Sequence, residues 1–453
     1  MTCDLLVLGG GPAGYEAALE GAALGLSCTL VERDLLGGTC LNRGCIPTKL
    51  LLGATAAVEE LAAQAKVRVA AGSISTDMAA LCTRKDRLLE ATRKAMRQKL
   101  ESLGVTVLSG AGRVLRPGLV RVDGPEGAQE VPYATLILAT GSRPASFPGL
   151  APDGAAVLDS DGFLGLTAMP ASLLVVGAGF IGLEMAQAAH RFGCSITLLD
   201  ALDRVAVQED PEVSAALLSQ CKRWKWDVRL GVKVASLKTV DGRAALTLDS
   251  GETLSADKAL IAVGRRPNSA DLGLEALGVE LPRSGFVPVD EHLRAAENVH
   301  AVGDLNGRLL LAHAAAHQAR YAVRHAAGKQ PGPYAPGPVP SILYGCPEAL
   351  RVGRTARELQ DQGLPVQVSS APLAANPMAQ AHAQTQGFVK VCWSHGKVAG
   401  VTACGYDVSR LATTAAVMVA QGWTRDQALE LIFPHPTLDE TLLAALAAEP
   451  KNI

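Results

Sequence analysis

The sequence predicts an α/β protein in which one β-turn-α-β unit occurs twice and a separate α+β module follows. Two observations carry this prediction. A short apolar run, a glycine-rich turn and an alanine-rich segment follow one another at residues 4–32, and the same succession returns at residues 172–200. A proline-rich stretch then divides residues 341–453, which have no glycine turn of this kind, from the rest of the chain. The length of 453 residues is enough for about three domains.

The composition indicates a globular protein that binds neither nucleic acid nor a membrane. Hydrophobic residues make up 48% of the chain and charged residues 19%, so there is enough apolar surface to build cores. The formal net charge is −2, with lysine and arginine scattered, so nothing in the sequence would attract a phosphate backbone or an anionic membrane strongly.

The sequence shows no sign of a membrane span or a secretion signal. It contains no run of about 18 apolar residues, and its start, from Met1 to Asp4, lacks the basic residues of a signal peptide. We therefore expect a cytoplasmic protein. In that reducing compartment, eight scattered cysteines of the ten are expected to be buried small hydrophobes, whereas Cys40 and Cys45 stand close together.

Residues 4–32 have the pattern of a dinucleotide-binding unit. The expected strand, helix and second strand lie at 4–8, 15–24 and 27–31. Gly9 and Gly11 would let the chain turn tightly and approach a pyrophosphate, and Gly14 would let the helix pack on the strand. Glu32, at the end of the second strand, would accept hydrogen bonds from ribose hydroxyl groups. The alternative is an ordinary strand-helix turn, which is disfavoured because strand, helix and acid are all in place.

Residues 172–200 repeat this pattern, which predicts a second Rossmann-like domain. The expected elements lie at 173–176, 183–192 and 195–199. Gly177, Gly179 and Gly182 take the places of the three glycines, and Asp200 takes the place of the acid. A carboxylate suits a free ribose hydroxyl and repels a 2′-phosphate, so NAD is preferred over NADP. Arg204, further along the chain, is expected at the surface.

Turn-rich stretches mark the expected domain boundaries. Residues 143–149 would end the first domain, and Pro331–Pro340, with five prolines, would form an extended linker. Beyond the linker, alternating runs at 388–391 and 398–401 predict antiparallel strands. Alanine-rich segments predict helices near 411–421 and 425–432.

Cys40-Leu-Asn-Arg-Gly-Cys45 is the most specific feature of the sequence. Its spacing differs from the Cys-x-x-Cys of zinc sites and thioredoxin motifs. Residues five apart do not face each other squarely in an ideal helix, but Gly44 and Pro47 allow a distorted helix start where the sulfur atoms could meet. We interpret the pair as a redox-active disulfide, with one thiol exchanging with substrate and the other facing an electron acceptor. The alternative, two buried free thiols, is weakened by the dinucleotide unit just before it.

Two further pairs are candidates for acid-base chemistry. His435 is followed by Glu440, and a nearby carboxylate can fix the tautomer of a histidine that acts as general base. Taken alone, such a histidine is more often a surface or capping residue. Lys49 and Glu184 form the second candidate pair, although charged residues near a helix start usually face solvent.

Several segments together carry a family resemblance. One is the segment around the cysteines, Gly37-Gly-Thr-Cys-Leu-Asn-Arg-Gly-Cys-Ile-Pro-Thr-Lys49. The others follow in order along the chain: Ala139-Thr-Gly141, Gly264-Arg-Arg-Pro-Asn268, Ala301-Val-Gly-Asp304, Leu311-Ala-His313, and His435-Pro-Thr437 with Glu440. This ordered set resembles the class I pyridine nucleotide-disulfide oxidoreductases, and most of all the dihydrolipoamide dehydrogenases among them.

The resemblance implies FAD and NAD as cofactors, no metal, and a role for each candidate residue. The residues implied to bind FAD are Gly9, Gly11, Gly14, Glu32, Lys49, Gly112, Thr140, Gly141, Asp304 (on the ribitol) and Ala312. Those implied to bind the nicotinamide dinucleotide are Gly177, Gly179, Gly182, Asp200, Val234 and Gly264. Cys45 would face the flavin as a charge-transfer thiolate and Cys40 would exchange with substrate. Lys49 would pair with Glu184 beside the isoalloxazine.

The resemblance also implies a domain order and a homodimer. Residues 1–147 and 266–337 would form the two parts of an FAD-binding and central region, 148–265 an NAD-binding domain, and 338–453 an interface domain. His435 and Glu440 would then serve the disulfide of the second subunit in the dimer.

Differences within the family favour a dihydrolipoyl dehydrogenase that serves a lipoyl-bearing protein of a 2-oxoacid dehydrogenase or glycine cleavage system. A glutathione reductase would be expected to have an arginine for NADP where this chain has Asp200. A mercuric reductase would be expected to end in two adjacent cysteines, and a soluble transhydrogenase would lack Cys45. Departures from the pattern occur at Cys346, Met378 and Arg410. The alternatives are an NAD(P)H-dependent reductase of another small disulfide, and a redox-silent flavin-binding subunit of a lipoyl complex.

Overall fold

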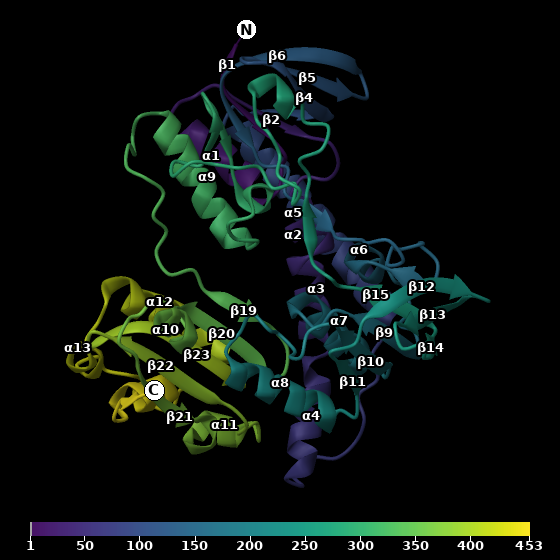
Figure 1. The fold of residues 1–453 in the computed structure, drawn as a ribbon, viewed down its shortest axis with the longest axis vertical. Helices are drawn as coiled ribbons and strands as arrows, with labels where there is room; N and C mark the ends of the chain where they lie inside the picture. The colour runs from purple at the N-terminus through teal and green to yellow at the C-terminus, as the bar shows by residue number, and fades with distance from the viewer. Residues whose placement is uncertain (1) are drawn as a thin grey trace. The chain divides into compact units, whose positions relative to one another are not determined.

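The computed structural model describes residues 2–453, which form two compact units (Figure 1). The first unit consists of Met1–Pro47, Ala80–Ala145 and Gly264–Pro336, and the second of Thr48–Ala79, Ser146–Val263 and Gly337–Ile453. Each unit is therefore built from three stretches of chain that are far apart in the sequence. No helix among residues 2–453 has the length and hydropathy that a membrane span would need.

The first unit is built on a sheet whose parallel part has the order β18-β6-β1-β2-β3. Leu5, Leu6 and Val7 of β1 are fully buried, as expected for a parallel strand covered on both faces. The strands of this unit are β1 (Cys3–Leu8), β2 (Cys28–Glu32), β3 (Thr106–Ser109), β4 (Ala111–Arg116), β5 (Leu119–Gly124), β6 (Gly127–Leu138), β7 (Ser142–Pro144), β16 (Arg265–Pro267), β17 (Arg294–Ala296) and β18 (Val299–Ala301).

Two alanine-rich helices, α1 (Pro12–Ala23) and α9 (Ala312–Ala326), pack together in this unit. Their small side chains share one buried cluster, while the ion pairs Arg320–Glu16 and Arg324–Glu20 join them at 2.8 and 2.6 Å. The remaining helical segments are α2 (Gly38–Arg43), α5 (Met78–Ser102), which begins in the second unit, η1 (Leu274–Leu277) and η2 (Gly303–Asn306).

The second unit repeats the parallel sheet in the order β8-β15-β9-β10-β11, and next to it lies a small antiparallel sheet, β12-β13-β14. The strands are β8 (Val157–Leu158), β9 (Ser172–Val176), β10 (Ser195–Asp200), β11 (Asp227–Leu230), β12 (Val234–Val240), β13 (Arg243–Leu248), β14 (Thr253–Ala256) and β15 (Lys258–Ile261). The helices are α3 (Cys45–Ala54), which begins in the first unit, α4 (Ala56–Lys66), α6 (Ser160–Leu164), α7 (Phe180–Arg191) and α8 (Pro211–Arg223).

The C-terminal part of the second unit is a six-stranded antiparallel sheet with helices packed on it. The sheet order is β19-β20-β23-β22-β21-β24. The strands are β19 (Ser341–Leu343), β20 (Glu348–Gly353), β21 (Gln367–Pro372), β22 (Phe388–Ser394), β23 (Lys397–Gly405) and β24 (Lys451–Asn452). The helical segments are α10 (Ala356–Asp361), η3 (Leu373–Ala375), α11 (Pro377–Ala381), η4 (Val408–Leu411), α12 (Ala412–Gln421), α13 (Arg425–Leu429) and α14 (Asp439–Ala447).

The elements expected from the sequence are present, with shifted ends. The first helix begins at Pro12 and not at Tyr15, and α7 begins at Phe180 and not at Leu183, so the third glycine of each turn lies inside the helix. The reason for the first shift is that proline is well suited to the first helical position. No helix or strand occurs between Gly328 and Pro340, as the prolines of this stretch predict.

Burial confirms most of the expectation for the scattered cysteines. Six of the eight are buried, whereas Cys82 and Cys346 are half-buried. Burial raises the pKa of Cys28, Cys194 and Cys221 to about 12, so these thiols are protonated at neutral pH and serve as core residues.

Candidate functional site

The turn between β1 and α1, residues 9–14, is shaped by three glycines, and we call it the first glycine turn. Gly9 has φ 103°, and a Cβ there would lie 2.4 Å from the carbonyl oxygen of Ala139. A Cβ on Gly14 would lie 1.7 Å from the oxygen of Gly9. At Gly11, in contrast, the nearest atom to such a Cβ is 3.8 Å away, so a side chain would project into open space before the helix.

The acid at the end of β2 is turned towards this turn. Glu32 accepts hydrogen bonds from the backbone N–H of Gly10 at 2.6 Å and of Asp34 at 2.8 Å. Each carboxylate oxygen keeps a further lone pair for a ribose hydroxyl group. The carboxylate thus stands beside the turn in the position that the fingerprint predicts for a ribose.

The turn between β9 and α7, residues 177–182, has the same geometry and is the second glycine turn. Gly177 has φ 110°, and its Cβ would lie 2.3 Å from the oxygen of Ala262. A Cβ on Gly182 would lie 1.9 Å from the oxygen of Gly177, whereas one on Gly179 would meet nothing within 4 Å. Asp200 accepts from the N–H of Ala178 at 2.6 Å and of Leu202 at 2.8 Å.

Both turns fit the pyrophosphate of a dinucleotide. Neither α1 nor α7 has a side chain that caps its N-terminus, so the N–H groups of the first turn are open to an anion, in α1 from Ala13 on because Pro12 has none. The open space at Gly11 and Gly179 is where the pyrophosphate would lie, because a side chain at either position would fill it.

Apart from Lys49, which belongs to the second unit, the remaining residues predicted to bind the flavin lie in the first unit. Asp304, in η2, accepts from the hydroxyl of Ser142 at 2.5 Å, and Arg265 donates to Ser142 at 2.7 Å. Thr140 donates to the carbonyl of Asn268 at 2.8 Å, and Gly141 adopts φ 68° next to it. The N-terminal end of α9 begins at Ala312, and Gly112 lies on β4 with a would-be Cβ 2.6 Å from Leu8.

Two residues predicted to bind the nicotinamide dinucleotide belong to different units. Val234 begins β12 in the second unit, together with the second glycine turn. Gly264 is the first residue of the third segment of the first unit, where it adopts φ 113°.

The cysteine segment is attached to the first glycine turn. The N–H of Gly37 donates to the carbonyl of Gly10 at 2.8 Å, and Gly38 packs so closely that a Cβ there would lie 2.7 Å from the Cα of Gly11. Cys40, in α2, is half-buried, and Cys45, the first residue of α3, is exposed. A cofactor held by the first glycine turn would therefore lie next to the cysteine segment.

Gly44 separates the two helices that carry the cysteines. A Cβ on Gly44 would lie 3.0 Å from the carbonyl oxygen of Thr39 and 3.5 Å from the Cα of Cys40. Gly44 is thus tightly packed and is the single residue between α2 and α3, so the expected distorted helix start is a break between two helices.

Lys49 and Glu184 meet in the second unit although they are far apart in the sequence. The Nζ of Lys49 lies 2.7 and 2.9 Å from the two carboxylate oxygens of Glu184, which is buried. The N–H of Tyr344 donates to the same carboxylate at 3.0 Å, and the Tyr344 ring centroid is 4.6 Å from Nζ. Tyr344 thus supports the pair from a third segment.

His435 and Glu440 form an oriented pair at the surface of the second unit. The Nδ1 of His435 lies 2.8 Å from Oε1 of Glu440, and the N–H of Thr437 donates to Oε2 at 3.0 Å. These hydrogen bonds hold the pKa of Glu440 below its usual value, so the carboxylate is charged and selects the Nδ1–H tautomer. The side chain of His435 is 72% exposed, which leaves Nε2 open to a substrate or a second subunit.

The comparisons with known proteins account for nearly all of the chain. Residues 3–319 match the family described as pyridine nucleotide-disulphide oxidoreductase, and residues 339–446 match its dimerisation domain. The chain belongs to this family. It is therefore a flavoprotein disulfide oxidoreductase that uses FAD and a nicotinamide dinucleotide, and its C-terminal module is a dimerisation domain of this family.

Relatives in this family match over their full lengths. The dihydrolipoyl dehydrogenase of Bacillus subtilis is 34% identical, covering 99% of this chain and 98% of the relative. That of Chlorobaculum tepidum is 35% identical, covering 98% and 96%. Among solved structures, LpdA from Mycobacterium tuberculosis superposes with a TM-score of 0.91 at 28% identity, covering 98% of this chain and 99% of the other. The HOCl-induced flavoprotein disulfide reductase RclA from Escherichia coli has a TM-score of 0.89 at 25% identity, covering 99% of each chain.

The structure also shows groups that sequence reasoning missed in this flavoprotein. Ser142 and Arg265 orient Asp304, and Tyr344 supports Lys49, but no sequence pattern connects these distant positions. Burial raises the pKa of Cys346, one of the departures from the family pattern, to about 12, which disfavours its thiolate at neutral pH. Its Sγ lies 3.2 Å from Oε1 of Gln384.

Proposed function

We propose that this chain oxidises a dihydrolipoyl dithiol with NAD+, by way of the Cys40–Cys45 pair and FAD. Residues 1–147 and 266–337 would hold FAD, residues 148–265 would hold NAD, and residues 338–453 would form the dimer interface. The full-length likeness to dihydrolipoyl dehydrogenases supports the dithiol as substrate. The lipoyl group would be carried by a protein of a 2-oxoacid dehydrogenase or glycine cleavage system.

One observation carries the choice of NAD. Both carboxylate oxygens of Asp200 are held at the second glycine turn by the N–H groups of Ala178 and Leu202. The charge would therefore be held beside the adenosine ribose, where it would accept from a 2′-hydroxyl and repel a 2′-phosphate.

His435 and the cysteines would carry the thiol chemistry. Nε2 of His435 takes a proton from the substrate dithiol, and Glu440 stabilises the resulting imidazolium. The substrate thiolate attacks Sγ of Cys40, breaks the Cys40–Cys45 bond and leaves Cys45 as a thiolate. The second substrate thiol then displaces Cys40, so the substrate leaves as a disulfide and both cysteines are reduced.

The cofactors complete the electron balance. The first glycine turn with Glu32 and Asp304 would hold FAD, which would supply the acceptor for the electron pair of the two reduced cysteines. The second glycine turn with Asp200 would hold NAD+, which would supply the final acceptor of that pair as hydride. Lys49 and Glu184 would lie at the flavin, where the buried carboxylate keeps the ammonium group in place.

A second candidate function is the reduction of another small disulfide by a nicotinamide dinucleotide. The similarity to a flavoprotein disulfide reductase at 25% identity supports it. A redox-silent flavin-binding subunit is the third possibility, and the oriented His435–Glu440 pair counts against it.

A substrate panel on the purified, FAD-containing enzyme tests the proposal. We expect NAD+ reduction with dihydrolipoamide, little activity with NADP+, and little oxidation of NADH by glutathione disulfide. Preferred turnover of glutathione disulfide would favour the second candidate. No turnover with any pair, in protein that retains flavin, would favour the third.

Co-expression of two inactive variants tests whether the site is shared between subunits. In a heterodimer of Cys45→Ser and His435→Ala chains, a shared arrangement gives one site with both defects and one with neither. We expect about half the wild-type activity per heterodimer. Inactive heterodimers, verified by two different affinity tags, would show that His435 serves its own chain.

A further inference from the structure

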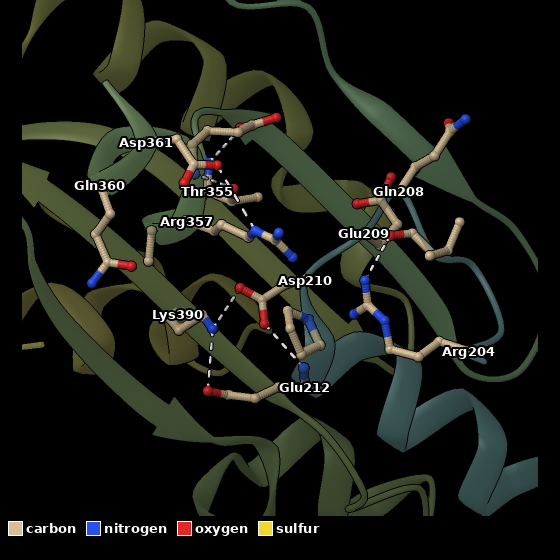
Figure 2. Close-up of a pocket in the computed structure, with 14 residues that line it drawn as sticks. Arg204, Gln208, Glu209, Asp210, Glu212, Thr355, Arg357, Gln360, Asp361 and Lys390 are labelled. Atoms are coloured by element: carbon tan, nitrogen blue, oxygen red, sulfur yellow. Dashed lines mark hydrogen bonds and ion pairs between the residues drawn. The ribbon is translucent and has the colours of Figure 1, made fainter. Parts of the chain in front are cut away.

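A charged cavity of about 440 Å³ lies in the second unit (Figure 2). Its wall is formed by Arg204 and Val207–Asp210 of the segment between β10 and α8, by the first two residues of α8, by α10 with Thr355 before it, and by Lys390 of β22. The segment 201–210 begins directly after Asp200, the residue predicted to bind the ribose. We call it the ribose loop. The cavity is therefore bounded on one side by the ribose loop and on the other by the dimerisation domain.

A buried ion pair connects the two sides. Nζ of Lys390 lies 2.7 Å from Oδ2 of Asp210 and 3.2 Å from Oε1 of Glu212 (Figure 2). The side chains of Lys390 and Asp210 are only 8% and 5% exposed. Burial works to lower the pKa of Lys390, but its hydrogen bonds and the carboxylate charges outweigh burial and raise it. The lysine is therefore charged, and Asp210 is its main partner.

A second ion pair ties down the neighbouring residue of the ribose loop. Glu209, which is 3% exposed, accepts from Arg351 of β20 at 3.1 Å. Arg351 also reaches Glu358 of α10 at 3.3 Å. Two successive loop residues are thus held by cations from two strands of the dimerisation domain.

The held end of the loop is bonded to the second glycine turn. The N–H of Glu209 donates to the carbonyl of Ala206 at 2.8 Å, and the N–H of Ala206 donates to the carbonyl of Ala178 at 2.8 Å. Ala178 also donates its own N–H to Asp200. An ion pair and hydrogen bonds therefore lead from Arg351 through Glu209 and Ala206 to the turn and the acid. Lys390 joins this path through Asp210, which follows Glu209 in the chain.

The backbone of the loop needs this support. Ala206 has φ 45°, a left-handed conformation that is unfavourable for alanine, and it is 3% exposed. Such residues persist only where the surrounding structure holds them. Arg204, which we expected at the surface, is half-buried, and its Nη2 donates to the carbonyl of Val207 at 2.8 Å inside the same loop.

We propose that Lys390 is a positioning residue for the nicotinamide dinucleotide: through Asp210 it holds the ribose loop, and with it Asp200 and the second glycine turn, in the shape that binds the cofactor. This proposal rests on the proposed function. It makes the affinity of the second dinucleotide site depend on a residue of the dimerisation domain.

Three variants of the FAD-containing enzyme test this role. Lys390→Met removes the cation. The double variant Lys390→Met/Asp210→Asn removes the link without leaving a buried charge, and asparagine still caps α8 as Asp210 does through the N–H of Glu212. Arg229→Met is the matched control, because Arg229 also pairs with two carboxylates, Asp227 and Glu252, but not with the ribose loop. The readouts are the Kd for NADH by calorimetry, the flavin content and the Tm.

We expect Lys390→Met to weaken NADH binding about tenfold, as for residues that act on a site through an intervening element. Flavin content should not change. The double variant should recover most of the Tm but still bind NADH weakly, whereas Arg229→Met should bind it like the wild type. If Lys390→Met does not fold, the Kd of the double variant for NADH is sufficient to test the proposal.

Wild-type affinity in the double variant would overturn the proposal, because the loop would then hold its shape without the link. Equal weakening by Arg229→Met would overturn it as well, since the effect would not be specific to the loop. A wild-type enzyme that binds no NADH would instead contradict the proposed function, which keeps the two failures apart.

Discussion

The two glycine turns have nearly the same geometry, but different segments of the chain are hydrogen-bonded to them. Their first glycines have φ 103° and 110°, and their acids accept from the second residue of the turn at 2.6 Å in both cases. In both, the carbonyl of that second residue accepts a bond of 2.8 Å from the segment after the acid. In the first turn the donor is Gly37, which leads to the cysteines. In the second it is Ala206, whose loop is tied to the dimerisation domain.

The comparison extends to the sheets. The parallel strands β18-β6-β1-β2-β3 correspond in order to β8-β15-β9-β10-β11, and each sheet has a small antiparallel neighbour. The last strands of the two parallel series differ, and only β8 is an edge strand, because β17 continues the first sheet beyond β18. Val157 and Leu158 of β8 are apolar and buried, whereas β18 contains His300, which is 2% exposed. The same glycine turn thus occurs at two sites, and the segments attached to each turn decide which chemistry that site would perform.

The third glycines should give the largest effects. A Cβ on Gly14 or Gly182 would lie under 2 Å from a backbone oxygen, at 1.7 and 1.9 Å, and the helix would have to move away from the strand. We expect Gly14→Ala to abolish FAD binding. Gly182→Ala should keep FAD and lose NADH binding. The flavin absorbance and an NADH titration measure both, and a fully yellow Gly14→Ala protein would contradict the comparison.

The cysteines follow the first glycine turn only, so their substitution should affect the dithiol chemistry and the flavin spectrum. Either Cys40→Ser or Cys45→Ser should lower dithiol turnover by about 10³-fold or more, as for loss of a covalent nucleophile. If Cys45 faces the flavin, Cys40→Ser keeps a thiolate donor and a long-wavelength absorption band, and Cys45→Ser lacks that band. The opposite spectra would exchange the two roles.

Of the two acids, only Asp200 at the second turn should set the choice between NAD and NADP. We expect Asp200→Arg to shift the ratio of kcat/KM for NADP+ to that for NAD+ by about 10- to 100-fold, because it exchanges repulsion of a 2′-phosphate for attraction. Flavin content should not change, since Glu32 is untouched. Equal kcat/KM values for the two cofactors in the wild type would refute the role assigned to Asp200.

His300 should make the first unit the more sensitive to acid. Burial, and then the charges of His325 and Arg294, lower its pKa from 6.5 to about 4. The unfolded chain therefore binds the proton more readily between these values. The free energy of unfolding should fall by about 1.4 kcal/mol per pH unit as the pH drops through this range.

Denaturant titrations between pH 7 and 4, followed by flavin fluorescence, measure this slope. His300→Gln cannot take up the proton and should flatten it, whereas His395→Asn, at an exposed turn, is the control that should keep it. An unchanged slope in His300→Gln would show that other groups cause the acid sensitivity.

The sequence by itself determined the two turns and their acids. The need for glycine at Gly9 and Gly14, and for an acid at Glu32, follows from local backbone geometry and from the reach of one strand-helix-strand unit, so a spacing pattern is enough to identify them. The break between Cys40 and Cys45 was foreseen only in part, because Gly44 indicated irregularity without showing that two helices meet there.

Only the tertiary structure decided which distant residues support these sites. Lys49 with Glu184, Asp304 with Ser142, and Lys390 with Asp210 join segments that lie more than a hundred residues apart. A charged side chain in the sequence looks the same whether it is solvated or paired. Its role depends on whether folding removes water from it and brings an opposite charge or a hydrogen-bond donor to within about 3 Å, and that is fixed by how the sheets are connected.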